Sequence, residues 1–366
     1  MLDKFAFIIH PLDTSDIYRK FSFAKKLPEK MVERAMRFLP PVKASYITNI
    51  KSKHNTTEGW FVACPLSAKQ MVDLPTDFVI KRIIQTGKLA EKLGAKVVGL
   101  GAMTSVVGDA GITVAKNLNI PVTTGNSYTV ATAIEGTKRA AKLMGKDLKE
   151  VKVAIIGATG SIGNVCAHLM ARETKDMVIV ARDQQRLDKL ANKLLYEYGL
   201  AINTTVNVKK AVSQADVIIS VTGSAESVIE PGDIKPGAVI CDVARPRDVS
   251  KKVAEERDDV LIIEGGVVEV PGDVEFNFDF GFPKKTSYAC MAETMILTLE
   301  KRFENYTLGR ELSLKQVEDI QKMADKHGFK LAGFRSFERA VSSDHIRQIQ
   351  ARAIERLKKL TAASTL

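Results

Sequence analysis

A glycine-rich loop stands between an apolar strand and a helix in the middle of the chain. The strand is predicted over residues 151–156 and the helix over 164–173. Between them, Gly157 permits a tight turn, Gly160 lets a pyrophosphate approach the backbone, and Gly163 lets the helix pack closely on the strand. Free N–H groups at the helix start would bind the phosphates. The pattern predicts a dinucleotide site formed by Gly157, Thr159, Gly160, Ser161, Ile162 and Gly163.

The end of the second strand of this unit indicates which dinucleotide is bound. A carboxylate there would accept a hydrogen bond from the ribose 2′-hydroxyl of NAD. This chain instead has Ala181 and Arg182, and Arg186 follows one helical turn later. A guanidinium group binds a phosphate through paired hydrogen bonds and stacks on adenine. We therefore predict NADPH as the cofactor, with Asp183 pointing away or capping the helix that begins at Gln184.

Two further turns follow later strands of the same unit. Thr222 and Gly223 come after a strand predicted over 217–221, and Gly266 comes after one predicted over 260–263. At the carboxyl edge of a parallel sheet, such turns contact the ribose and the nicotinamide of a dinucleotide. They could equally be ordinary loops, and the sequence leaves both interpretations open.

Cys290 is the cysteine whose neighbours favour a reactive thiolate. It follows Lys284 and Lys285 and stands near the start of a helix predicted over 287–303. If Ser287 caps that helix, Cys290 is its third residue, close to the positive end of the helix dipole. A thiolate there can act as a nucleophile, and the free N–H groups can stabilise an oxyanion. The spacing alone leaves a buried structural thiol as the alternative.

The other cysteines and the five histidines form no pattern typical of catalysis or metal binding. Cys166 and Cys241 fall within a predicted helix and a predicted strand, so both are expected in the core. Cys64 follows an apolar strand, and its role is ambiguous. Because there is no CxxC pair and no Cys/His cluster, we predict neither a metal site nor a disulfide framework.

Strands and helices alternate along the chain, which predicts an α/β fold with a parallel sheet wound on both faces. At about 150 residues per domain, 366 residues make two to three domains. We predict an N-terminal α/β substrate domain over residues 1–147 and a Rossmann NADP-binding domain over 148–283. A C-terminal helical segment over 284–366 would carry Cys290.

The composition excludes several classes of protein. With 45% hydrophobic and 27% charged residues the chain can bury a core, and no apolar run approaches the ~18 residues of a membrane-spanning helix. No secretory signal is visible, so a cytoplasmic protein is expected. The net charge of +11 predicts a solvated basic surface or attraction to an acidic partner. No motif indicates a nucleic-acid partner.

Several stretches, in order along the chain, resemble the cyanobacterial long-chain fatty acyl-[acyl-carrier-protein] reductases. They are Leu100–Ser105, Thr123–Asn126, Gly157–Gly163, Ala181–Leu187, Gly265–Glu269, Ala289–Glu293 and His327–Phe329. The resemblance runs from about residue 5 to residue 332. It implies the reduction of a fatty acyl thioester to a fatty aldehyde with NADPH, and it places the family's nucleophilic cysteine on Cys290.

The same resemblance implies a set of substrate contacts and partners. Cys290 would form an acyl-enzyme, and the acyl chain would lie against Thr124, Gly125, Asn126 and Tyr128. The partner would be a fatty acyl thioester of an acidic acyl carrier protein or of coenzyme A, and an oligomer is compatible with this function. The chain departs from the family at Tyr128, where the family has a histidine, and after Ala332, where the family ends.

Two alternatives remain at this point. A shikimate dehydrogenase-like or glutamyl-tRNA reductase-like NADP oxidoreductase shares the layout, and the segment Asp242–Val249 resembles the second of these. In the tRNA enzyme the thioester-forming cysteine lies in the N-terminal domain, so Cys64 would be the nucleophile. A non-catalytic NADP-binding sensor would keep the glycine loop and need no reactive thiol.

Overall fold

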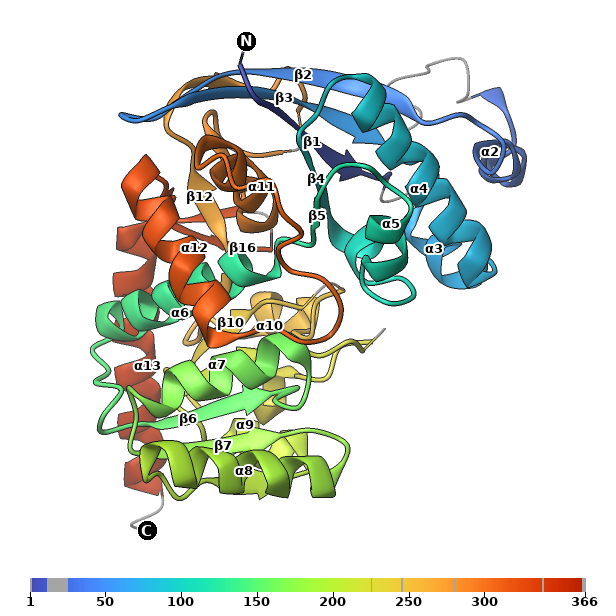
Figure 1. The fold of residues 1–366 in the computed structure, drawn as a ribbon. Helices are drawn as coiled ribbons and strands as arrows, with labels where there is room; N and C mark the ends of the chain where they lie inside the picture. Colours follow the sequence, from blue (N-terminus) through green and yellow to red (C-terminus); the bar gives the residue numbers. More distant parts are fainter. Residues whose placement is uncertain are drawn as a thin grey trace. The chain divides into compact units, whose positions relative to one another are not determined.

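The computed structural model describes residues 2–11, 26–224, 226–244, 246–279, 281–337 and 339–363 (Figure 1). The chain divides into two compact units, each formed from separate stretches of sequence. The first comprises residues 1–128, 268–312 and 318–330, and the second comprises 129–267, 313–317 and 331–366. The segment predicted over 284–366 therefore contributes to both units. The roles assigned above to the three predicted segments stay predictions.

A six-stranded sheet of order β13-β2-β3-β1-β4-β5 organises the first unit. Its strands are β1 (Lys4–Ile9), β2 (Val42–Lys51), β3 (Thr56–Ala63), β4 (Val97–Leu100), β5 (Val122–Thr123) and β13 (Gly272–Glu275). β1 runs parallel to β3 and β4, and β4 runs parallel to β5. β2 runs antiparallel to both of its neighbours, β3 and β13. The sheet is therefore mixed.

Successive side chains of β1 point to opposite faces of this sheet, and a different helix covers each face. Ala6 and Ile8 join a buried cluster with residues of α4 (Thr76–Lys92). Phe7 lies on the opposite face, because successive side chains of a strand point to opposite sides. There a β-carbon on Gly99 would meet both Phe7 and Thr294 of α11 (Ala289–Leu299). Among the residues that the structure describes, this unit also contains α2 (Glu29–Met36), α3 (Ala68–Asp73), α5 (Ile112–Lys116) and the 3₁₀ turn η2 (Ala102–Ser105).

The second unit is a doubly wound parallel sheet of order β11-β10-β9-β6-β7-β8. Its strands are β6 (Lys152–Ile156), β7 (Asp176–Val180), β8 (Asn203–Thr205), β9 (Val217–Ser220), β10 (Val239–Asp242) and β11 (Leu261–Glu264). Its helices are α7 (Ser161–Ala171), α8 (Gln184–Tyr198), α9 (Val208–Gln214), α10 (Lys251–Glu256), α13 (Ser343–Ala363) and the 3₁₀ turn η3 (Pro231–Asp233). Numbered within the unit, the order is 3-2-1-4-5-6, the Rossmann arrangement. The predicted fold class is confirmed.

Some elements lie where the division between the units falls. α6 (Asn126–Leu143) begins in the first unit and continues into the second, and α12 (Leu314–His327) does the reverse. β12 (Val267–Glu269), β14 (Thr286–Tyr288) and β15 (Lys330–Leu331) form a three-stranded sheet of order β14-β12-β15, and β16 (Phe334–Ser336) pairs with β17 (Arg339–Val341). Within the described residues, no helix combines the length and the apolar character that crossing a bilayer would require.

Candidate functional site

The glycine loop of the second unit has the geometry that its sequence predicts. Gly157 adopts a φ of +82°, and a β-carbon on it would lie 2.7 Å from the Val221 carbonyl oxygen. A β-carbon on Gly163 would lie 2.2 Å from the Gly157 carbonyl oxygen, so only glycine allows α7 to pack this closely. Gly160 caps α7 without a side chain over the first turn. The loop therefore presents the helix start as a cradle suited to a pyrophosphate.

A second loop lies directly beside the first at the same edge of the sheet. β6 and β9 are neighbours, and the turn after β9 carries Thr222 and Gly223. A β-carbon on Gly157 would lie 3.2 Å from the Thr222 Cα. The buried carboxylate of Asp248 fixes this turn, since it accepts hydrogen bonds from the Ser220 hydroxyl at 2.6 Å, the Thr222 amide at 2.9 Å and the Thr222 hydroxyl.

The strand order changes direction between β6 and β9, which is where doubly wound sheets bind their ligands. The two adjoining loops lie at that point. The predicted contact Gly266 lies elsewhere, in the turn between β11 and β12, with a φ of +79°. Its contact with the dinucleotide stays a prediction.

The two predicted phosphate-binding arginines lie at the end of β7 and the start of α8. Ala181 is half-buried, and both Arg182 and Arg186 are exposed. Asp183 caps α8, as expected, because its carboxylate accepts a hydrogen bond from the Arg186 amide at 3.1 Å. The Arg186 guanidinium donates to the Thr159 carbonyl at 2.9 Å, so it lies against the glycine loop. Chains that bind NAD have an acidic side chain at the end of this strand, next to the ribose. This chain has Arg182 there, and its guanidinium fits a 2′-phosphate.

Cys290 lies in the first unit at the start of α11 and is half-buried. Its neighbour in space is Gly125, whose φ of +77° forms the turn before α6. A β-carbon on Gly125 would lie 2.3 Å from the Cys290 Cβ and 2.4 Å from its Cα. The sequence-predicted Gly125 and Cys290 are therefore in direct contact, although 165 positions separate them in the sequence.

Two details of the Cys290 environment differ from expectation. Residues 286–288 form strand β14, so α11 begins only at Ala289, with Tyr288 rather than Ser287 as its N-cap. Cys290 is therefore the second helical residue and not the third. The Lys285 ammonium also pairs with the Asp273 carboxylate at 2.7 Å, which partly offsets its charge. The helix start remains the feature that favours a thiolate at Cys290.

The other three cysteines are buried. Burial raises the pKa of the Cys64 thiol to about 11, which disfavours it as a nucleophile. Burial likewise raises the pKa of Cys166 far above its ordinary value. Cys241 packs with its sulfur 3.8 Å from the Ala133 carbonyl oxygen. The expectation that Cys166 and Cys241 belong to the core is confirmed, and Cys64 joins them there.

A buried carboxylate that the sequence did not single out lies next to Cys290 on α11. Glu293 is fully buried and accepts hydrogen bonds from side chains and backbone of the segment around Gly125. The available signal was a single acidic residue in a run of otherwise apolar or small residues. A charged residue in such a run is rarely buried without partners. Asp248 in the second unit was missed for lack of any comparable signal.

The predicted substrate residues other than Gly125 lie within three positions of it in the sequence. Thr124 is buried, and its amide donates to the Thr307 carbonyl at 3.0 Å. Asn126 is half-buried at the first position of α6. Tyr128 is 1% exposed, and its ring meets that of Phe329 edge-on with centroids 6.5 Å apart. The role of these residues in binding an acyl chain stays a prediction.

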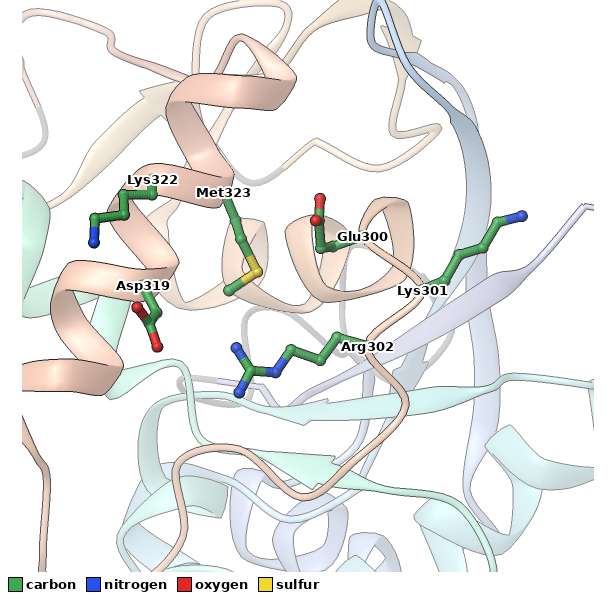
Figure 2. Close-up of a pocket in the computed structure, with 6 residues that line it drawn as sticks. All are labelled: Glu300, Lys301, Arg302, Asp319, Lys322 and Met323. Carbon is green, nitrogen blue, oxygen red and sulfur yellow. The ribbon is translucent and has the colours of Figure 1, made fainter.

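A separate, open pocket of about 420 Å³ lies elsewhere in the first unit. Figure 2 shows its lining, which comes from the residues that follow α11 and from α12: Glu300, Lys301, Arg302, Asp319, Lys322 and Met323. Several of its charges are already paired, because Glu300 binds Lys326 and Arg302 binds Glu304. Among the described residues, no group of three or more His, Cys, Asp or Glu side chains could hold a metal ion.

Residues 138–263 match the family model for shikimate and quinate 5-dehydrogenases. The chain is 30% identical to the aminotransferase PigE of a Serratia species over 89% of its own length, but it spans only 39% of that protein. It is 26% identical to the long-chain acyl-[acyl-carrier-protein] reductase of Synechococcus elongatus, covering 79% of this chain and 87% of that one.

A second reductase and a solved dehydrogenase structure are also similar to this chain. A glutamyl-tRNA reductase of a Picosynechococcus species is 26% identical over 67% of this chain and 55% of its own length. The solved structure of the L-tryptophan dehydrogenase of Nostoc punctiforme covers 97% of this chain and 89% of its own, at 11% identity and a TM-score of 0.41. The sequence matches show that the chain is similar to reductases and dehydrogenases, and its second unit has the Rossmann arrangement of a dinucleotide-binding domain.

Proposed function

We propose that this chain reduces a fatty acyl thioester to a fatty aldehyde with NADPH. The observation that carries the proposal is the environment of Cys290. This thiol is half-buried at a helix start beside the Gly125 turn, whereas the three other cysteines are buried. The similarity to the Synechococcus acyl-[acyl-carrier-protein] reductase supports the same reaction, since it extends over most of both chains.

Cys290 would act as the nucleophile. Its thiolate attacks the carbonyl carbon of the thioester, and the oxyanion that forms is stabilised by the N–H groups at the start of α11. When the carbonyl re-forms, the bond to the carrier sulfur breaks. The carrier leaves as a thiolate and takes a proton from water. The acyl group is then bound to Cys290 as a new thioester.

The second unit would hold the cofactor. Gly157, Gly160 and Gly163 shape the cradle for the pyrophosphate, and Arg182 and Arg186 would bind the 2′-phosphate. When bound, NADPH supplies the hydride that reduces the carbonyl carbon of the acyl-enzyme. Cys290 then leaves as a thiolate while the oxygen closes to the aldehyde carbonyl. Overall, one hydride and one proton convert the thioester into an aldehyde and a free thiol.

An acidic acyl carrier protein and coenzyme A are the two carriers whose charge fits this chain. The net charge of +11 favours encounter with an anionic partner through long-range attraction. Coenzyme A is also anionic, so charge alone does not select between the two. Measuring activity with each thioester at low and at high salt separates the two carriers. High salt should lower activity more with the carrier-protein thioester than with the coenzyme A thioester, because salt screens the attraction between two charged protein surfaces.

A direct assay tests the reaction. The protein is incubated with NADPH and a panel of acyl thioesters, and the fall in absorbance at 340 nm is compared with aldehyde formed. Without NADPH, mass spectrometry should find the acyl group on Cys290, and Cys290→Ser should form neither adduct nor aldehyde. Cys64→Ala is the matched control and should keep both. An acyl group on Cys64 would reverse the assignment.

The glutamyl-tRNA reductase alternative would need Cys64 as its nucleophile. Cys64 is 0% exposed, and burial raises its pKa to about 11. The geometry therefore supports the Cys290 reaction better. A sensor that binds NADP without catalysis would leave every thioester of the panel unreduced.

A further inference from the structure

We propose that Glu293 is a positioning residue that holds Cys290 in place against the Gly125 turn. The inference rests on the proposed function, in which Cys290 is the nucleophile. Glu293 follows Cys290 by three residues, and side chains at this spacing lie on the same face of a helix. Its side chain is 0% exposed. A carboxylate is rarely buried unless it is paired or fully hydrogen-bonded.

Both oxygens of this carboxylate are occupied. Oε2 accepts hydrogen bonds from the Ser127 hydroxyl at 2.6 Å and from the Tyr128 amide at 2.9 Å. Oε1 accepts from the Thr307 hydroxyl at 2.9 Å and from the Thr123 hydroxyl. Three hydroxyl groups and one backbone amide thus replace the water that an exposed carboxylate would bind. Charge-assisted hydrogen bonds of this kind are stronger than those between neutral groups.

The positions of the donors explain what the bonds do. Thr123 precedes Gly125 by two residues, and Ser127 follows it by two, so the carboxylate binds the chain on both sides of the turn. The turn itself lies against Cys290, with the close approach described above. Any shift of the first turn of α11 relative to Gly125 would therefore break bonds to Glu293. The carboxylate fixes the backbone that carries Cys290.

Thr307 extends the same connection to the chain beyond α11. Its hydroxyl lies 2.9 Å from the Thr123 hydroxyl and 3.0 Å from that of Thr124, while it also donates to Glu293. Its carbonyl oxygen accepts from the Thr124 amide at 3.0 Å. The turn is thus held from two sides, and Glu293 is the charged group at the centre of the connection.

Three variants test this role. Glu293→Leu removes every acceptor, whereas Glu293→Gln keeps one oxygen for the Tyr128 amide and offers its NH₂ group to the threonine hydroxyls, which can accept. Thr298→Val is the matched control, because this buried hydroxyl on α11 donates only to the Thr294 carbonyl within the helix. Melting temperatures show whether each variant folds and how much stability it has lost.

We expect Glu293→Leu to lower kcat for thioester reduction by about 100-fold with KM within a factor of about two, since small displacements of a reacting group cost about that much. Glu293→Gln should recover at least about a tenth of the wild-type kcat. Thr298→Val should keep kcat even if it melts as early as Glu293→Leu. If Glu293→Leu and Thr298→Val have equal kcat values at equal loss of melting temperature, the positioning role is wrong.

A second readout needs no substrate and separates this inference from the proposed function. Hydrogen exchange of a peptide covering residues 123–130 should be faster in Glu293→Leu, because the Tyr128 amide loses its acceptor, and near wild type in Thr298→Val. If the wild-type protein reduces no thioester, the proposed function is wrong. Faster exchange in Glu293→Leu would still support the link between Glu293 and the turn. Unchanged exchange would overturn the link itself.

Discussion

Gly125 and Cys290 approach so closely that a β-carbon on the glycine would lie 2.3 Å from the Cys290 Cβ. Real β-carbon contacts are not this short, so Cys290 occupies the space that a side chain at position 125 would need. The φ of +77° at Gly125 independently favours glycine. Two separate requirements, one steric and one conformational, therefore meet at this position.

The first prediction separates these two requirements by substitution to alanine. Gly125→Ala should destabilise the protein by about 1–2 kcal/mol through its positive φ, and by about 1–3 kcal/mol more through the clash with Cys290. Chemical denaturation measures the sum. It should also change the rate at which iodoacetamide modifies Cys290, because the first turn of α11 must move.

Gly94→Ala provides the control for this prediction. Gly94 also has a positive φ, +88°, but a β-carbon there would meet nothing within 4 Å. Its substitution should therefore cost only the conformational part and leave the modification rate of Cys290 unchanged. Equal losses of stability in the two variants would show that the clash with Cys290 costs nothing. The contact between Gly125 and Cys290 would then contribute little to the position of the thiol.

The nucleotide-binding unit could be predicted from sequence because its signals are local. Each buried strand is a short apolar run, and the glycine loop stands directly between β6 and α7. The Asp183 cap of α8 was likewise visible, since an N-cap and the helix it starts are adjacent in sequence. Such features need no knowledge of the rest of the fold.

The surroundings of Cys290 could be predicted only in part. The thiol itself stood out, but the N-cap of α11 was placed one residue early, because pairing in a sheet extends the strand through Tyr288. The bonds of Glu293 join residues about 165 positions apart. Pairing over that distance depends on how strands and helices pack, and no local pattern records it.

The second prediction concerns the order in which the cysteines react. In native protein at pH 8, iodoacetamide should modify Cys290 first, because it is half-buried and the thiolate is the reactive form. With its pKa raised to about 11, Cys64 would be ionised in only about one molecule in a thousand at that pH. Peptide mass spectrometry after short exposures measures the order.

Two outcomes of this experiment are informative. In denaturant all four cysteines should react at similar rates, which shows that burial and not local sequence causes the difference. If Cys64 of the native protein reacts as fast as Cys290, the first unit must open readily around β3, and the case against Cys64 as a nucleophile would fail.

The third prediction assigns different roles to the two arginines beside the glycine loop. Arg182→Ala should weaken NADPH binding by about 10- to 100-fold, the loss expected for one or two charge-assisted hydrogen bonds, and leave NADH binding unchanged. Arg186→Ala should weaken both, because its guanidinium also braces the loop through the Thr159 carbonyl. Fluorescence titration with each dinucleotide measures both effects.

Arg172→Ala is the control for the arginine variants. Arg172 is an exposed arginine of the same unit whose guanidinium lies over the Tyr198 ring, 5.7 Å from its centroid. Its removal lowers the charge equally but should not affect either dinucleotide. If Arg182→Ala weakened NADH and NADPH alike, the residue would not contact the 2′-phosphate, and the assignment of NADPH specificity to it would be wrong.

The fourth prediction concerns pH and begins with a buried histidine. His327, at the end of α12, is 1% exposed. Its Nε2 lies 2.7 Å from a Glu300 carboxylate oxygen, and its Nδ1 lies 2.9 Å from the Ser52 hydroxyl in the turn between β2 and β3. A neutral ring donates to Glu300 through Nε2 and accepts at Nδ1 when the single Ser52 hydroxyl proton points to the ring instead of to the Asn55 carbonyl, 3.0 Å away.

Burial lowers the pKa of His327 below its ordinary 6.5, with Lys326 and His54 acting in the same direction and Glu300 opposing them. The unfolded chain therefore binds a proton at a pH where the folded chain does not, so stability is lost as pH falls below about 6.5. One such proton contributes at most about 1.4 kcal/mol per pH unit. Urea denaturation between pH 7 and pH 5.5 measures the slope. This range lies above that in which Glu300 titrates, because its pKa is lowered by Lys326 and His327 despite burial.

His327→Gln should flatten this slope, since glutamine can donate to Glu300 and accept from Ser52 at every pH. His168, which is also buried with a lowered pKa, remains in both proteins, so the difference between their slopes belongs to His327 alone. At pH 7 the variant should be less stable than the wild type, because the substitution removes the packing of the ring. It should approach the wild type, or exceed it, at pH 5.5. Parallel slopes would mean that His327 is already protonated in the fold, as a charged partner of Glu300.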